Sequence, residues 1–314
     1  MINGKIVYKI LGSLLFIEAA LLLLCLGMAF YYNEDDIIAF LISAITTALF
    51  GFILKHKGNG ADNTMGRRDA YLVVTLSWVI FSLFGTLPFL ISGYITSFTD
   101  AYFETMSGFT TTGATILDDV EALPHGLLFW RSLTQWIGGL GIVFFTIALL
   151  PSLVGGSVRV FAAEATGPIK SKLHPRLSTS AKWLWTVYLV LTIACIGTYF
   201  LFGMGWFDSL NYAMTTTATG GFSTHNTSTE FFRSPALEYA STLFCFLSGV
   251  NFTLLYATVV KFKPGSLFKN TEFKFYLTLV LGFTAFIMLE LITRRGYDVE
   301  HAFRCGIFQV VSFI

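Results

Sequence analysis

The sequence predicts an all-α membrane protein with two N-terminal spans followed by repeated modules. Each module contains a helix, a segment that re-enters the membrane and a second helix. Two observations predict this fold class: a composition too apolar for a soluble domain, and two similar Thr- and Gly-rich stretches set between apolar spans. Of the 314 residues, 54% are hydrophobic and only 12% are charged, about half the charged share of a soluble domain.

Apolar stretches along the chain are long enough for seven membrane-spanning helices. A helix needs about 20 mostly apolar residues to cross the hydrocarbon core. The stretches that approach this length are residues 10–32, 37–54, 70–93, 127–150, 183–204, 236–260 and 275–293. Most of the 20 lysines and arginines fall in segments on the same side as the N-terminus. Because cytoplasmic loops carry an excess of Lys and Arg, we expect a multi-pass protein with a cytoplasmic N-terminus.

Charge and motifs exclude several other classes. The net charge of +1 argues against a nucleic-acid-binding protein. The sequence has no HExxH, G-x-S-x-G or Walker loop. We therefore predict neither an enzyme nor a bound cofactor.

An internal repeat lies between the apolar spans. Residues 98–115 (FTDAYFETMSGFTTTGAT) align with residues 207–222 (FDSLNYAMTTTATGGF), and Asp100 pairs with Asp208. With a one-residue gap, residues 110–115 then pair with residues 217–222. A third copy is predicted to begin with the 275–293 span, and residues 308–312 resemble residues 103–107. The chain stops where a third Thr/Gly run is expected, which predicts a truncated sequence.

Each copy is expected to form a short helix followed by an extended stretch of small residues. Glycine permits positive φ and close backbone approach, so successive carbonyl oxygens can turn toward one axis. Such carbonyls replace the water shell of an alkali cation in potassium-selective filters. The predicted ion-binding residues are Thr111, Thr112, Gly113, Ala114, Ala218, Thr219, Gly220 and Gly221. Nearby acids such as Asp100 and Asp118 would concentrate cations at the mouth.

At these residues the sequence resembles the Trk/Ktr/HKT superfamily of potassium transporters, and it is most similar to the TrkH/TrkG-type membrane subunit. The matching motifs are residues 107–115 (SGFTTTGAT), residues 130–141 (WRSLTQWIGGLG) and residues 218–224 (ATGGFST). The resemblance covers nearly the whole chain, including two N-terminal spans that Trk-type members carry and Ktr-type members lack.

The resemblance implies potassium uptake across the bacterial inner membrane through a filter made by four repeats of a full-length chain. It makes Gly113 and Gly220 the filter glycines of the first two repeats. It also implies a homodimer in the lipid bilayer that binds a cytoplasmic, nucleotide-binding regulatory subunit of the TrkA type. Two alternatives stay open: a secondary carrier that couples K⁺ to Na⁺ or H⁺, and a non-conducting fragment or scaffold.

Five regions are expected along the chain. Residues 1–69 hold the two N-terminal helices and a cytoplasmic loop, and residues 70–160 hold pore repeat one. A cytoplasmic linker (161–180) precedes pore repeat two (181–264), and residues 265–314 begin a third repeat.

Three further features allow two interpretations each. Arg131 is either a tie behind the first filter or an anchor at a helix end. Residues 249–251 (GVN) mark either a helix break or ordinary packing. His225 either tunes the access of ions by protonation or is a solvated loop residue.

Overall fold

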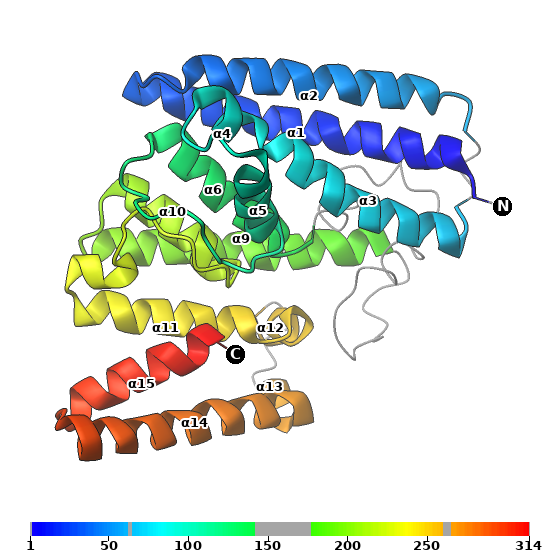
Figure 1. Ribbon diagram of the computed structural model, residues 1–314. Coiled ribbons are helices and arrows are strands. Elements are labelled where there is room, and N and C mark those ends of the chain that lie inside the picture. The colour runs from blue at the N-terminus through cyan, green and yellow to red at the C-terminus, as the bar shows by residue number, and fades with distance from the viewer. Residues whose placement is uncertain (1, 62–64, 142–176, 260–264, 314) are drawn as a thin grey trace. The chain divides into compact units, whose positions relative to one another are not determined.

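The computed structural model describes residues 2–61, 65–141, 177–259 and 265–313. Within these ranges the regular secondary structure is helical, which confirms the predicted all-α class (Figure 1). The chain forms two compact units, unit 1 (residues 1–185) and unit 2 (residues 186–314).

Five helical stretches in the described part of the chain are long and apolar enough to cross a membrane. They are Gly4–Tyr32, Ile37–Lys57, Arg68–Ser92, Trp183–Leu201 and Thr271–Arg295. Each overlaps one of the seven predicted spans. Of the predicted span 127–150, residues 142–150 lie outside the described residues. The same is true of residues 161–176 of the predicted linker.

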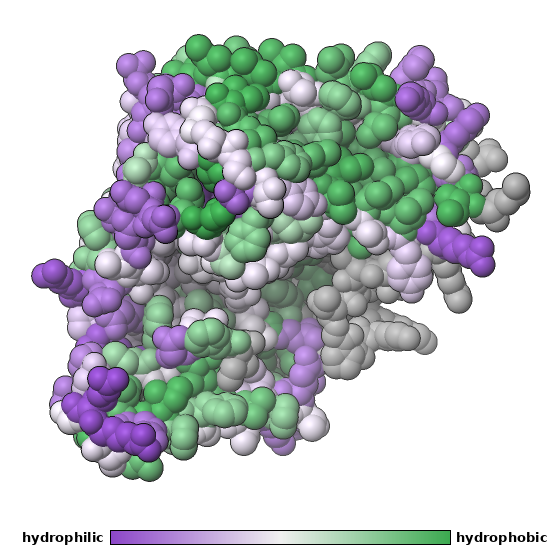
Figure 2. All heavy atoms as spheres, viewed as in Figure 1, coloured by the Kyte–Doolittle hydropathy of each residue, from purple (hydrophilic) through white to green (hydrophobic). Residues whose placement is uncertain are grey.

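Unit 1 begins with a helical hairpin of α1 (Gly4–Tyr32) and α2 (Ile37–Lys57). The two helices pack against each other, with Gly12 of α1 against the backbone of Gly51 in α2. The remaining surface of α2 exposes large apolar side chains such as Ile38, Ile45 and Phe52. Figure 2 shows hydrophobic surface over this hairpin and hydrophilic surface at its ends. Such a distribution is what a helix in lipid requires.

Four further helices complete the described part of unit 1 up to Gly141. These are α3 (Arg67–Gly85), α4 (Leu87–Ser92), α5 (Phe98–Phe109) and α6 (His125–Gly138). The carboxylate of Asp69 accepts hydrogen bonds from the backbone N–H groups of Asn3 and Gly66, both at 2.8 Å, and so joins the starts of α1 and α3. The short helix α5 packs against α3 and α6. The indole N–H of the fully buried Trp130 in α6 donates to the carbonyl of Gly85 in α3 at 3.0 Å, which fixes the walls around α5.

Unit 2 repeats the arrangement of a long helix, a short helix and a second long helix. The long helix α9 (Leu177–Leu201) enters this unit at Thr186, and α10 (Trp206–Thr217) and α11 (Pro235–Gly249) follow. Their core contains Cys195, Tyr199, Met204, Tyr212, Ala213, Leu237, Ala240 and Phe244. Within it the hydroxyl of Tyr199 is 2.9 Å from those of Thr216 and Ser241, which ties α9 to both neighbours.

The rest of unit 2 consists of α12 (Phe252–Val259), α13 (Gly265–Lys269), α14 (Thr271–Arg295) and α15 (Val299–Phe313). Helix α15 packs against both α11 and α14. The predicted third copy at residues 308–312 lies within α15.

The prediction of one helix over residues 236–260 is wrong, because α11 ends at Gly249 and α12 begins at Phe252. The backbone N–H of Val250 donates to Leu247 instead of Phe246. The freed carbonyl of Phe246 accepts a hydrogen bond from the hydroxyl of Tyr276 in α14 at 3.2 Å. Residues 249–251 therefore form a helix break, which the hydrogen bond from Tyr276 in α14 stabilises.

Candidate functional site

The C-terminal end of α5 leads into residues 110–116, which we name filter segment one after the prediction. The backbone N–H groups of Thr110, Thr111 and Thr112 donate to the carbonyls of Met106, Gly108 and Ser107, at 2.9 to 3.0 Å. Thr111 then has a φ of 54° and Gly113 a φ of 75°. The helix thus ends through one left-handed threonine, and a left-handed glycine follows two residues later.

The C-terminal end of α10 has the same backbone arrangement, leading into residues 218–224, named filter segment two. The N–H groups of Ala218, Thr219 and Gly220 donate to the carbonyls of Met214, Thr216 and Thr215, at 2.9 to 3.1 Å. Thr219 has a φ of 53° and Gly221 a φ of 86°. Each of these backbone features of filter segment one has its counterpart 108 positions later.

This agreement corrects the register of the repeat. The constant offset of 108 that pairs Asp100 with Asp208 continues through the filter segments, so the one-residue gap expected from the sequence is not needed. Gly113 is structurally equivalent to Gly221, and Gly220 is equivalent to Thr112. The sequence comparison missed this because both segments are rich in Thr and Gly, so a shift by one residue still pairs similar letters.

The threonines at the helix ends are the unusual feature of both segments. A β-branched residue with positive φ is a steric outlier. Such a conformation costs of order 1–3 kcal/mol and persists where the surrounding structure fixes it, often at functional sites. Thr111 and Thr219 adopt it independently in two units. The local backbone strain is therefore a property of the repeat.

Filter segment one is held from behind by buried side chains. The hydroxyl of Ser107 donates to the carbonyl of Ala114 at 2.6 Å. The carboxylate of Glu104 in α5 accepts from the hydroxyl of Thr115 and from the backbone N–H of Ile116, both at 3.0 Å. These contacts fix both the middle and the end of the segment.

Arg131 completes this group from α6. Its Nε lies 2.9 Å from Oε1 of Glu104, and its Nη2 donates to the hydroxyl of Thr115 at 3.3 Å. The side chains of Arg131 and Glu104 are 2% and 0% exposed, so neither anchors the chain at a water interface. Of the two interpretations of Arg131, the structure supports the tie behind the filter segment.

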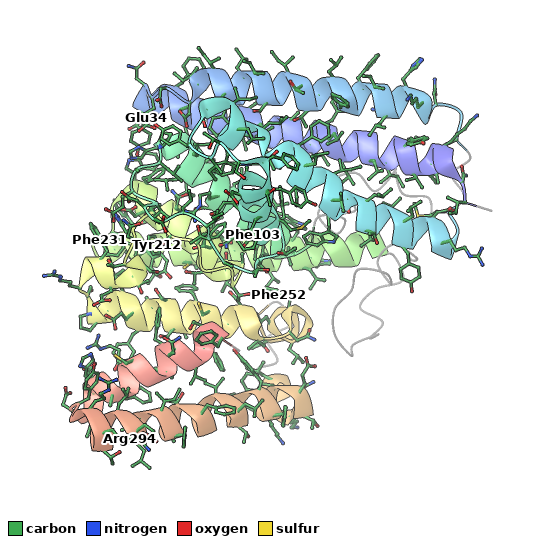
Figure 3. All side chains as sticks on the ribbon, in the orientation of Figure 1. Glu34, Phe103, Tyr212, Phe231, Phe252 and Arg294 are labelled. Carbon is green, nitrogen blue, oxygen red and sulfur yellow. The ribbon has the colours of Figure 1, made fainter. Side chains whose placement is uncertain are left out.

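Filter segment two is held by a different set of residues. Asp208, in the first turn of α10, accepts from the hydroxyl of Thr224 at 2.7 Å and lies 3.4 Å from Nε2 of His225. The imidazole of His225 stacks on the ring of Phe231, with centroids 3.6 Å apart. Figure 3 labels Phe231 and Tyr212, which lie at this end of unit 2. His225 is therefore a packed residue and not a freely solvated one.

The turn between α1 and α2 contacts the start of α6. Glu34, labelled in Figure 3, accepts from the backbone N–H of His125 at 2.6 Å and lies 2.7 Å from its Nδ1. Asp36 is buried against the backbone of Gly126. Anionic groups are favoured at a helix N-terminus. Burial, with the neighbouring Glu34 carboxylate, nevertheless raises the pKa of Asp36 to about 6.

The eight predicted ion-binding residues divide between the units, four in each filter segment. In segment one, Thr112 and Ala114 are exposed while Thr111 and Gly113 are half-buried. In segment two the exposed residues are Thr219 and Gly221. Glu104 is the functional candidate that the sequence analysis missed, because it is one of many acids in the segments between the spans. Its place about two turns into a short helix, 27 residues before a lone arginine, was the available signal.

The fold and these segments define a helical membrane protein with a repeated module, in which a short helix is followed by a strained Thr/Gly segment. Comparison with known proteins agrees with this class. The profile of the TrkH family, described as a cation transport protein, matches residues 37–313. The chain therefore belongs to the TrkH family of cation transport proteins, a family of transporters and not of enzymes.

Individual relatives cover the chain almost completely. It is 33% identical over 310 residues to the Trk system potassium uptake protein TrkH of Halomonas elongata, and 32% identical over 312 residues to TrkG of Escherichia coli K12. The crystal structure of the potassium transporter TrkH from Vibrio parahaemolyticus superimposes with a TM-score of 0.86 at 31% identity over 98% of this chain. In all three comparisons the chain spans 64% of the relative's length.

Proposed function

We propose that this chain supplies modules of a potassium uptake pathway in the bacterial inner membrane, with backbone carbonyls of the two filter segments contacting the dehydrated ion. The repeated left-handed Thr/Gly pair carries this proposal. It recurs at one offset, in two units, at the end of a short helix. A backbone that alternates conformation in this way presents carbonyls that a regular helix would engage in its own hydrogen bonds.

The proposal assigns the ion contacts to residues 111–114 and 218–221, with Gly113 and Gly221 as the equivalent glycines. The complete filter takes four such segments, of which this chain holds two and the α14–α15 pair opens a third. We further propose a cytoplasmic N-terminus, a homodimer and a TrkA-type regulatory partner. These rest on the lysine and arginine distribution and on the family.

The module boundaries follow from the same proposal. Repeat one occupies residues 70–160 and repeat two residues 181–264, joined by the linker 161–180. The N-terminal hairpin (1–69) precedes them, and the third repeat begins at residue 265.

Serine substitution of single glycines tests both the function and the register. The variants Gly113→Ser, Gly221→Ser and Gly220→Ser are expressed from the complete coding sequence in a bacterial strain that lacks potassium uptake. A side chain at φ near +80° is strained, so Gly113→Ser and Gly221→Ser should each reduce the K⁺/Na⁺ uptake ratio by about tenfold, equivalent to about 1.4 kcal/mol. Uptake of K⁺ and Na⁺ is measured by flame photometry.

Gly220→Ser is the matched control, since its equivalent Thr112 already carries a side chain. It should change the ratio by less than either other variant. Immunoblots of membrane fractions establish equal expression. Unchanged selectivity in both Gly113→Ser and Gly221→Ser, at normal expression, would refute the ion-contact assignment. A larger effect of Gly220→Ser would instead restore the gapped register.

A further inference from the structure

The Glu104–Arg131 pair lies where it can determine the shape of filter segment one without touching an ion. Glu104 is on α5 and Arg131 on α6, and both side chains are almost completely buried. The carboxylate receives three donors: Nε of Arg131 at 2.9 Å, and the Thr115 hydroxyl and the Ile116 N–H at 3.0 Å. Two of these three donors belong to the filter segment itself.

Thr115 connects the pair to the segment in both directions. Its hydroxyl donates to the Glu104 carboxylate and accepts from Nη2 of Arg131 at 3.3 Å and from the N–H of Leu117 at 3.2 Å. Every hydrogen-bonding direction of this hydroxyl is thus used. The chain two residues after the left-handed Gly113 is therefore held by charge-assisted hydrogen bonds, which are shorter and stronger than neutral ones.

A strained backbone needs such support. The left-handed conformation of Thr111 persists only where its surroundings fix it. At the start of the segment the hydrogen bonds at the end of α5 do so, and in the middle Ser107 holds Ala114. Glu104 holds the far end, so a shift of its carboxylate would move the carbonyls between these fixed points.

The described residues of repeat two contain no such pair. At the offset of 108 that relates α5 to α10, Glu104 corresponds to the buried Tyr212, and α11, the counterpart of α6, contains no arginine or lysine. Filter segment two is anchored through Asp208, one turn or more earlier on its helix than the position of Glu104. A buried ion pair costs desolvation free energy that apolar residues would avoid. Its presence in repeat one and its absence from the described part of repeat two indicate a role specific to filter segment one.

We propose that Glu104 and Arg131 are positioning residues that set the ion selectivity of filter segment one by holding Thr115 and Ile116. This inference rests on the proposed function. Neither residue contacts the ion. The pair as a whole is neutral, so its effect on selectivity comes from geometry.

The test compares four variants in the complete protein: Glu104→Gln, Glu104→Asp, Arg131→Lys and the double variant Glu104→Gln/Arg131→Gln. Glu104→Gln should lower the K⁺/Na⁺ uptake ratio by about tenfold, the size expected from weakening a charge-assisted hydrogen bond. Glu104→Asp and Arg131→Lys keep the charges but shorten or unfork the contact. Each should lower the ratio by about threefold, a smaller effect than that of Glu104→Gln, because the charge is kept.

The double variant separates positioning from simple stability. Removing both charges avoids a lone buried ion, so its thermal unfolding temperature should lie above that of Glu104→Gln. Its K⁺/Na⁺ ratio should nevertheless stay below wild type. The exposed ion pair of α14 supplies the control. Nε of Arg294 lies 2.8 Å from Oε2 of Glu290, and the two side chains are 77% and 39% exposed. Arg294→Gln should leave both the ratio and the unfolding temperature unchanged.

Wild-type selectivity in a folded Glu104→Gln or double variant overturns the inference. So does a loss of stability with no change in the ratio, which is what a merely structural pair would give. If Gly113→Ser alters selectivity while the Glu104 variants do not, the positioning role fails and the proposed function stands. If Gly113→Ser and Gly221→Ser leave selectivity unchanged as well, the proposed function itself fails.

Discussion

Filter segments one and two have the same backbone but are held by different side chains. Both follow a short helix, and both place a threonine and then a glycine in the left-handed region at the same spacing. Segment one is tied by a fully buried ion pair, and segment two by a half-exposed aspartate that contacts a threonine and a histidine. The repeat therefore preserves the path of the main chain, while each copy has its own means of fixing it.

The helices that start beyond the two segments differ in the same way. The start of α6 receives the acidic turn between α1 and α2. In unit 2, Glu238 near the start of α11 lies 2.5 Å from Nη1 of Arg304, which comes from α15. Carboxylates are present in both cases, and in unit 2 a neighbouring helix supplies the cation that pairs with one of them. Three substitutions test these differences, beginning with the largest expected effect.

The first prediction concerns the contact of α6 with the end of α5. A methyl group at Gly138 would overlap the carbonyl of Phe109, the last residue of α5. Gly138→Ala should therefore destabilise unit 1 by about 3 kcal/mol, the cost of forcing an atom into a packed interior. Thermal unfolding of the purified protein in detergent measures this effect.

Gly197 in α9 provides the matched control, because no atom lies within 4 Å of a Cβ added there. Alanine favours helix over glycine by up to about 1 kcal/mol, so Gly197→Ala should not lower the unfolding temperature. An equal loss of stability in both variants would contradict the close contact at Gly138.

The second prediction concerns pH and the turn of unit 1. Because the pKa of Asp36 is raised to about 6 in the folded protein, the folded state binds a proton more tightly than the unfolded chain. The resulting stability is present below about pH 4 and is lost as the pH rises through about 6. At pH 8, Asp36→Asn should be more stable than wild type by on the order of 2 kcal/mol.

This difference should vanish at about pH 4, which unfolding curves at several pH values would show. Asp118→Asn, at an exposed loop position, should leave the pH dependence as in wild type. If Asp36→Asn retained the wild-type pH dependence, another group would have to be responsible.

The third and smallest effect is expected in filter segment two. Thr224→Val removes the hydroxyl that donates to Asp208 at 2.7 Å. The loss of one hydrogen bond should cost about 1 kcal/mol of stability and change the K⁺/Na⁺ ratio less than Glu104→Gln does. Thr227→Val, at an exposed position in the same loop, should change neither. An effect of Thr224→Val as large as that of Glu104→Gln would mean that both segments depend equally on their anchors.

The helical class and most of the spans could be predicted from the sequence, because lipid demands long apolar stretches and these are visible in composition. The break at residues 249–251 was one of two interpretations of the sequence, and the sequence could not decide between them, since the break depends on Tyr276 reaching the carbonyl of Phe246 from another helix. A local pattern carries no information about such a partner.

The positions of both filter segments could also be predicted, but their register could not. Small residues repeat so densely there that Gly220 and Gly221 are indistinguishable by type. Only the φ values and the hydrogen bonds at the ends of α5 and α10 decide between them. Of the Glu104–Arg131 pair, the sequence indicated only the arginine, because it is a lone charge in an apolar stretch. Its partner could not be identified, because it is one of many acids between the spans.

That pair also bears on how α5 and α6 are held in the membrane. Burying an ionised arginine without a partner costs several kcal/mol, so α6 on its own is a poor candidate for burial in an apolar environment. Glu104 is translated 27 residues earlier and lies on the segment that packs beside α6. The pairing neutralises both buried charges within the folded unit, so α5 and α6 are expected to be stable in the membrane only when packed together.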